Sequence, residues 1–223
     1  MKPLLTDYDE RELADLPVIC DQPPYRVRQL HKWLVSGADF DEMTDLPKQL
    51  RARLEETYSA TGARIIKVAR SSDGTEKYLY SLNDGSLVEG VLMTYKYGRT
   101  LCVSTQVGCR MGCAFCASGR DGLFRNLSCG EMLGELTAAN ARAGDKRVGN
   151  VVLMGSGEPL DNYENVTKFI RRLSESGIVG QRSVSLSTCG LTDKVRALAD
   201  DGFSVTLCLS LHSPFDDRRV KIM

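Results

Sequence analysis

The strongest constraint on the fold is a repeated order of strand, loop and helix that begins at Gly98. The segments that read as buried strands are residues 100–104, 150–154, 183–186 and 204–209. The segments that read as amphipathic helices are residues 128–142, 164–176 and 193–201. Alternating strands and helices are typical of a parallel sheet, either open or closed into a barrel. The sequence therefore predicts an α/β fold for residues 98–223.

Each of the four predicted strands is followed by a segment rich in cysteine, glycine or polar residues. In chain order these segments are Cys109–Cys116, Gly155–Pro159, Ser187–Gly190 and Ser210–Ser213. All four follow the carboxyl ends of parallel strands, which is the edge where such folds bind ligands. We expect the four segments to converge on one site.

The segment after the first strand has the pattern C-x3-C-x2-C, formed by Cys109, Cys113 and Cys116. A structural zinc or iron–sulfur site is closed by four protein ligands, so a loop that supplies three leaves one coordination position open. In a [4Fe-4S] cluster, the iron without a protein ligand could chelate the amino and carboxylate groups of S-adenosylmethionine (SAM). One electron delivered to the sulfonium would then release a 5'-deoxyadenosyl radical. The pattern thus indicates a cluster that acts on SAM.

A zinc site is an alternative use of these cysteines, because thiolates also bind zinc. The candidates for its fourth ligand are Cys102, Cys129, His31 and His212. A disulfide is disfavoured, because the first residues do not resemble a signal peptide and no apolar run reaches the ~20 residues of a membrane span. We therefore expect a cytoplasmic protein with no membrane contact, in which thiols stay reduced.

The other strand-end residues each have a structural and a functional interpretation. The Gly-Ser-Gly segment at 155–157 fits a tight turn between strand and helix. Glu158 precedes Pro159, and a proline restricts the preceding residue to extended geometry. We therefore expect the Glu158 carboxylate to point outward and to bind the ammonium of a methionine moiety. Ser187 would either cap a helix or bind a ligand. His212 would either pack in the core or, given its polar neighbours, belong to the site.

Two accessory parts are expected before Gly98. Residues 1–60 read as a helical module with helices at 25–35 and 48–58, and its cationic side chains either face solvent or contact RNA. Residues 61–97 read as a three-stranded antiparallel insert, because Asp-Gly pairs separate alternating runs. Lys plus Arg and Asp plus Glu both number 29, so the net charge neither requires nor excludes a nucleic-acid partner.

Several segments together form a more specific pattern: Leu101–Cys116, Gly157–Asn162, Leu186–Gly190, Ser210–His212, Leu87–Glu89 and Arg28–Trp33. In this combination the chain resembles the RlmN family of radical SAM methyltransferases. The resemblance implies that Cys109, Cys113 and Cys116 hold a [4Fe-4S] cluster. The residues that it implies for SAM binding are Gly157, Glu158, Ser187, Ser210, Leu211 and His212. It also implies that Glu89 is a catalytic acid–base group and that Cys102 faces the reacting cysteine.

Members of that family methylate carbon 2 of an adenine in 23S ribosomal RNA and in some transfer RNAs. The resemblance implies the same activity here, through a methylated-cysteine intermediate, with an electron donor such as flavodoxin and a monomeric protein. The related Cfr-type enzymes methylate carbon 8 of adenine and share the cluster motif. Methylation of carbon 8 is therefore an alternative activity for this chain. A catalytically inert fragment that binds SAM or RNA is the other alternative.

The chain stops at Met223, soon after the fourth predicted strand. The family continues through further βα units to a tail that bears the methyl-carrying cysteine. We therefore expect a partial radical SAM (βα)6-type barrel, truncated after its fourth strand and incomplete for full turnover. It would be preceded by the helical domain, residues 1–60, and the antiparallel insert, residues 61–97.

Overall fold

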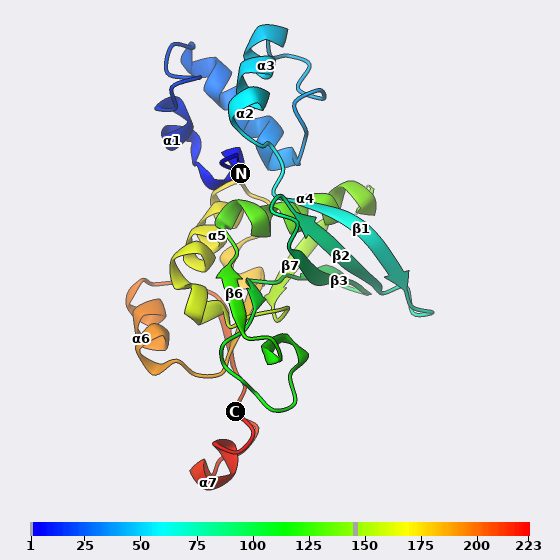
Figure 1. The fold of residues 1–223 in the computed structure, drawn as a ribbon, viewed down its shortest axis with the longest axis vertical. Helices are drawn as coiled ribbons and strands as arrows, with labels where there is room; N and C mark the ends of the chain where they lie inside the picture. Colours follow the sequence, from blue (N-terminus) through cyan, green and yellow to red (C-terminus); the bar gives the residue numbers. More distant parts are fainter. Residues whose placement is uncertain (1, 145–146) are drawn as a thin grey trace.

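The computed structural model of the chain describes residues 2–144 and 147–223. Its largest feature is a mixed seven-stranded sheet (Figure 1). The strand order in this sheet is β1-β2-β3-β4-β7-β8-β9. Strands β1 to β4 pair antiparallel, and β4, β7, β8 and β9 pair parallel. A separate two-stranded sheet pairs β5 (Gln106–Gly108) with β6 (Leu123–Asn126). Among the described residues, no helix combines the length and the apolar character needed to cross a membrane.

The N-terminal part is a helical unit with its own apolar core. Its elements are η1 (Leu5–Asp7), α1 (Glu10–Ala14), α2 (Pro24–Ser36) and α3 (Lys48–Thr57). Helix α2 begins with a proline in its first turn, buries Val27, Leu30 and Leu34 at helical spacing, and ends at Gly37 with φ of +80°. The helices predicted at 25–35 and 48–58 are confirmed.

The antiparallel strands are β1 (Ala63–Arg70), β2 (Glu76–Leu82) and β3 (Leu87–Tyr95). The turns at Gly74 and Gly85 have φ of +86° and +84°, a conformation that glycine adopts readily. The three predicted strands are therefore confirmed. They do not form a sheet of their own, because β3 pairs with β4 (Gly98–Cys102) and so joins the parallel strands. The division of the chain into three domains stays a prediction.

The remaining elements alternate as expected. The strands are β7 (Val148–Leu153), β8 (Val184–Thr188) and β9 (Thr206–Leu209), and the helices are α4 (Cys129–Ala143), α5 (Tyr163–Glu175), α6 (Thr192–Asp200) and the short α7 (Asp216–Arg219). The α/β class and the parallel order of the four strands are thus confirmed. The edges of the sheet are β1 and β9. Its relation to a six-unit barrel stays a prediction.

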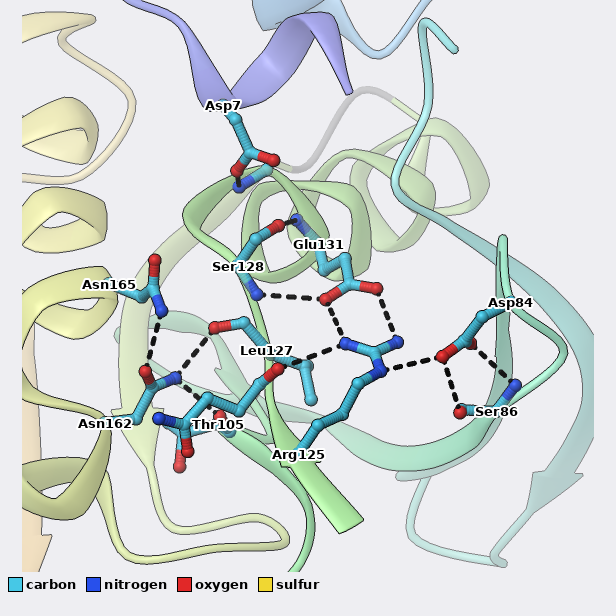
Figure 2. Close-up of polar contacts among 12 residues, drawn as sticks. Asp7, Asp84, Ser86, Thr105, Arg125, Leu127, Ser128, Glu131, Asn162 and Asn165 are labelled. Atoms are coloured by element: carbon cyan, nitrogen blue, oxygen red, sulfur yellow. Dashed lines mark hydrogen bonds and ion pairs between the residues drawn. The ribbon is translucent and has the colours of Figure 1, made fainter. Parts of the chain in front are cut away.

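Helix α4 joins the helical unit to the sheet. A Cβ atom at Gly130 would lie 2.6 Å from the hydroxyl oxygen of Thr6, and one at Gly134 would lie 2.5 Å from the backbone nitrogen of Ala63. Glycine at both positions therefore permits this close approach. The Asp7 carboxylate also accepts a hydrogen bond of 2.6 Å from the backbone N–H of Gly130 (Figure 2). Burial raises the pKa of the Asp7 carboxyl.

A charged cluster ties the two sheets to α4. Arg125, on β6 (Leu123–Asn126), donates to Asp84 in the β2–β3 turn at 2.7 Å. It also donates two bonds of 2.8 Å to the carboxylate of Glu131 in the first turn of α4 (Figure 2). Glu131 in turn accepts from the backbone N–H of Ser128, the N-cap of α4. These contacts fix β6 to the body of the protein. They thereby also hold one end of the loop that carries the three cysteines, residues 109–122, which we call the cysteine loop.

Candidate active site

The three cysteines of the C-x3-C-x2-C pattern lie in and beside the loop between β5 (Gln106–Gly108) and β6. The neck of this loop is narrow: the backbone N–H of Cys109 donates to the carbonyl oxygen of Gly122 at 2.9 Å. Gly108 has φ of +77°, and a Cβ there would lie 2.0 Å from the same oxygen. Only glycine fits this position. The loop lies toward the end of the molecule opposite the N-terminal helices (Figure 1).

Cys109 is buried, and Cys113 and Cys116 are partly exposed. Burial is the main cause that raises the pKa of the Cys109 thiol, and the nearby thiols of Cys116 and Cys113 raise it further. Among the described residues, no group of three or more Cys, His, Asp or Glu side chains is arranged so that it could hold a single metal ion. In a cubane cluster each thiolate binds a different iron, so three thiols from one loop fit that group.

Two residues that the sequence analysis did not single out hold this loop in place. The Gln106 amide donates to the side chains of Asn126 and Asp161, each at 2.8 Å. Its oxygen accepts from the backbone N–H of Glu158 at 2.9 Å. Asn162 donates to the carbonyl oxygens on either side of the hairpin, those of Thr105 at 2.8 Å and Leu127 at 2.7 Å (Figure 2). Both side chains are buried, and they connect the cysteine loop to the segment after β7.

The glycine-rich segment after β7 packs directly on the residues that precede the cysteines. A Cβ at Gly155 would lie 2.7 Å from the hydroxyl oxygen of Ser104. A Cβ at Gly157, where φ is +105°, would lie 2.6 Å from the Cβ of Gln106. The two glycines are therefore required by a close approach between loops, which a tight turn alone would not demand.

The side chain of Glu158 does not point outward as we expected. It is 5% exposed. Its two carboxylate oxygens accept from the backbone N–H groups of Leu160 at 3.1 Å and Cys189 at 2.8 Å. The extended geometry before Pro159 is present, but these backbone donors draw the side chain inward. Glu158 thereby links the ends of β7 and β8, and its contact with SAM stays a prediction.

Gly157→Ala is expected to lower the free energy of unfolding by about 2–4 kcal/mol, because it combines backbone strain with an overpacked contact. The matched control is Gly98→Ala. Gly98 also has a positive φ, of +136°, but a Cβ there meets nothing within 4 Å, so strain alone should cost about 1–2 kcal/mol. Urea denaturation of both variants measures the difference. If the two substitutions lowered the free energy of unfolding by the same amount, the contact between residue 157 and Gln106 would not contribute to the loss.

The ends of β8 and β9 also meet. The hydroxyl oxygens of Ser187 and Ser210 lie 3.2 Å apart. Among the described residues other than glycine, His212 alone has a positive φ, of +54°. Backbone strain of this kind is concentrated at functional segments. The His212 ring lies 4.5 Å from the ring of Phe115 in the cysteine loop, measured between centroids, and Leu211 beside it is half-exposed. The fourth strand end therefore reaches the cysteine loop.

Glu89 and Cys102 share one face of the sheet. Cys102 on β4 is directly opposite Val91 on β3, and Glu89 lies two residues before Val91, so their side chains point the same way. Burial raises the pKa of the Cys102 thiol to about 11. Glu89 is half-exposed and forms an ion pair of 2.7 Å with Lys77 on β2, a partner that the sequence analysis missed. Only the strand register could have identified Lys77.

Two family models match the chain. The model described as the radical SAM superfamily matches residues 103–223, and the model described as the ribosomal RNA large subunit methyltransferase N-terminal domain matches residues 4–59. The chain belongs to the RlmN family of radical SAM proteins. The family predicted from the sequence is thereby confirmed. Proteins of the RlmN family use a 4Fe–4S cluster and SAM.

Curated relatives in the RlmN family are similar over almost the whole chain. A probable dual-specificity RNA methyltransferase RlmN of Lachnoclostridium phytofermentans is 49% identical over 215 residues, which are 94% of this chain and 60% of that protein. One of Clostridioides difficile, with the same name, is 46% identical over 226 residues, which are 100% of this chain and 66% of that protein. The chain thus spans about two thirds or less of the length of these relatives.

A solved structure in the same superfamily is also similar. The crystal structure of a radical SAM methyltransferase from Sphaerobacter thermophilus matches with a TM-score of 0.93 and 40% sequence identity. The match covers 99% of this chain and 67% of that one. The arrangement of helical unit, mixed sheet and cysteine loop therefore agrees with that of a radical SAM methyltransferase.

Proposed function

We propose that this chain carries the cluster-binding, SAM-binding and N-terminal parts of a methyltransferase that modifies carbon 2 of an adenine in 23S ribosomal RNA and in some transfer RNAs. The observation that supports it is the convergence of the strand-end segments. Gln106 joins the cysteine loop to the glycine-rich segment, Glu158 joins that segment to the end of β8, and Phe115 contacts His212. Four segments of the RlmN pattern thus come together at one edge of the sheet.

In this proposal Cys109, Cys113 and Cys116 hold the cluster. The residues assigned to SAM are Gly157, Glu158, Ser187, Ser210, Leu211 and His212. When bound, the cluster would supply the electron that makes SAM a source of a radical. Radical chemistry is needed because carbon 2 of adenine is electrophilic and does not attack the methyl group of SAM by ordinary displacement. The narrow neck and the Gln106 contacts anchor the base of the cysteine loop beside the glycine-rich segment.

Glu89 and Cys102 would act on the substrate side of the site, since both lie on the face of the sheet described above. The carboxylate of Glu89 is accessible and can exchange a proton, with the ammonium of Lys77 beside it at 2.7 Å. Cys102 keeps its proton at neutral pH, because burial raises its pKa to about 11. It therefore faces the substrate side as a neutral thiol with its proton on Sγ.

The helical unit would contribute contacts to the RNA backbone. Arg28 and Lys32 lie four residues apart on α2, so they share one face of the helix, and both are exposed. Phosphate contacts of this kind position a nucleic acid without reading its sequence. An electron donor such as flavodoxin, a monomeric state and a location in the reducing cytoplasm complete the proposal.

The experiment is nucleoside mass spectrometry of 23S ribosomal RNA and transfer RNA from cells with the gene intact and with it deleted. We expect 2-methyladenosine to disappear on deletion. Loss of 8-methyladenosine alone would contradict the carbon 2 assignment and favour a Cfr-type enzyme. No change in any methylated adenosine would favour an inert protein.

A further inference from the structure

Ser104 is a fully buried residue that contacts two of the segments assigned to the site. Its hydroxyl donates to the carbonyl oxygen of Glu89 at 2.7 Å and accepts from the backbone N–H of Ser156 at 2.9 Å. Glu89 belongs to β3, and Ser156 belongs to the glycine-rich segment. One hydroxyl therefore links the strand that carries the proposed acid–base group to the segment proposed to bind SAM.

The glycine-rich segment has no freedom to move closer to Ser104. A Cβ at Gly155 would lie 2.7 Å from the Ser104 hydroxyl oxygen and 2.8 Å from its backbone nitrogen. The backbone N–H of Gly155 also donates to the carbonyl oxygen of Val103 at 3.1 Å. Direct packing and hydrogen bonds together set the distance between this segment and the end of β4.

Glu135 supports Ser104 from the side of helix α4. Its side chain is fully buried, and one carboxyl oxygen accepts from the backbone N–H of Ser104 at 3.2 Å. The other oxygen has no hydrogen-bond partner within the described part of the chain. Burial raises the pKa of the Glu135 carboxyl well above its usual range. The contact to Ser104 needs only one oxygen acceptor at this position.

We propose that Ser104 is a positioning residue: its hydroxyl fixes the backbone of Glu89 against the SAM-binding segment, and Glu135 holds the backbone of Ser104 in place. This inference rests on the proposed function. Ser104 does not act as a catalytic group, because its hydroxyl has one proton and that proton is directed to the Glu89 carbonyl oxygen. Loss of the hydroxyl leaves the Glu89 carbonyl oxygen and the Ser156 N–H, both partly buried, without this partner.

The test compares Ser104→Ala with Thr167→Val. Thr167 is also buried, but its hydroxyl donates to the carbonyl oxygen of Glu164 within the same helix α5, at 3.2 Å. Two quantities are measured: the hydrogen exchange rate of the Ser156 amide, and the dissociation constant of SAM from the anaerobically reconstituted chain. We expect Ser104→Ala to accelerate the exchange about tenfold and to weaken SAM binding about tenfold, as the loss of one partly buried hydrogen bond predicts. Thr167→Val should change neither.

Substitution of Glu135 provides a second arm. Glu135→Gln keeps an oxygen acceptor for the Ser104 N–H, so the Ser156 exchange rate and the SAM dissociation constant should both equal those of the wild-type chain. Glu135→Leu removes the acceptor and should change both quantities as Ser104→Ala does. The proposal is overturned if Ser104→Ala matches Thr167→Val in both measurements. Absence of SAM binding by the wild-type chain would instead overturn the proposed function. The exchange rate at Ser156 would still decide whether Ser104 holds the loop.

Discussion

Cys113→Ala is expected to abolish cluster binding, whereas the wild-type chain, reconstituted without oxygen, should bind about four irons and four sulfides. The reason is the number of ligands. The loop offers three thiols, one of the four irons of a cubane already lacks a protein ligand, and the loss of Cys113 leaves only Cys109 and Cys116. Iron and sulfide analysis, together with the visible absorption of the cluster, measures the effect.

Cys20→Ala is the matched control, because Cys20 is an exposed cysteine of the helical unit. It should bind the cluster as the wild-type chain does. If the wild-type chain bound one zinc ion tightly and took up no iron, the cluster assignment would be wrong and the zinc alternative would hold.

Much of the fold could be predicted from local patterns. The spacing of Val27, Leu30 and Leu34 predicts α2, and the Asp-Gly pairs predict the hairpins between β1 and β3. The β5–β6 hairpin could not be found in this way, because its strands have three and four residues and are separated by the cysteine loop. Likewise, the pairing of β3 with β4 is a tertiary contact that periodicity does not reveal.

The candidate site was predictable where a residue type itself carries the chemistry, as with the three cysteines. The residues that arrange the site were not. Gln106, Asn162 and Ser104 are buried polar residues whose role appears only when their partners from distant parts of the chain are in place. The direction of Glu158 was mispredicted for the same reason, since one of its partners is the N–H of Cys189, 31 residues away.

Arg125→Leu is expected to lower the free energy of unfolding by about 3–5 kcal/mol at pH 7, because it leaves a buried carboxylate without its cationic partner. The Glu131 side chain is 5% exposed and receives two hydrogen bonds from the guanidinium of Arg125. Urea denaturation measures the loss. The matched control is Arg64→Leu, which removes an ion pair with Asp39 whose side chains are 70% and 41% exposed, and which should cost less than about 1 kcal/mol.

The same cluster predicts a pH dependence through Asp84. The Arg125 guanidinium is the main cause that holds the pKa of the Asp84 carboxyl at about 2. A carboxyl whose pKa is lower in the folded state stabilises the protein above its unfolded pKa of ~3.9, and this contribution is lost as the pH falls through the folded pKa. The wild-type chain should therefore lose stability between about pH 4 and pH 2. Arg125→Leu should show a smaller loss over that range, because it lacks the guanidinium that lowers this pKa. Parallel pH profiles for the two proteins would contradict the assignment of Arg125 as the partner that keeps Asp84 ionised.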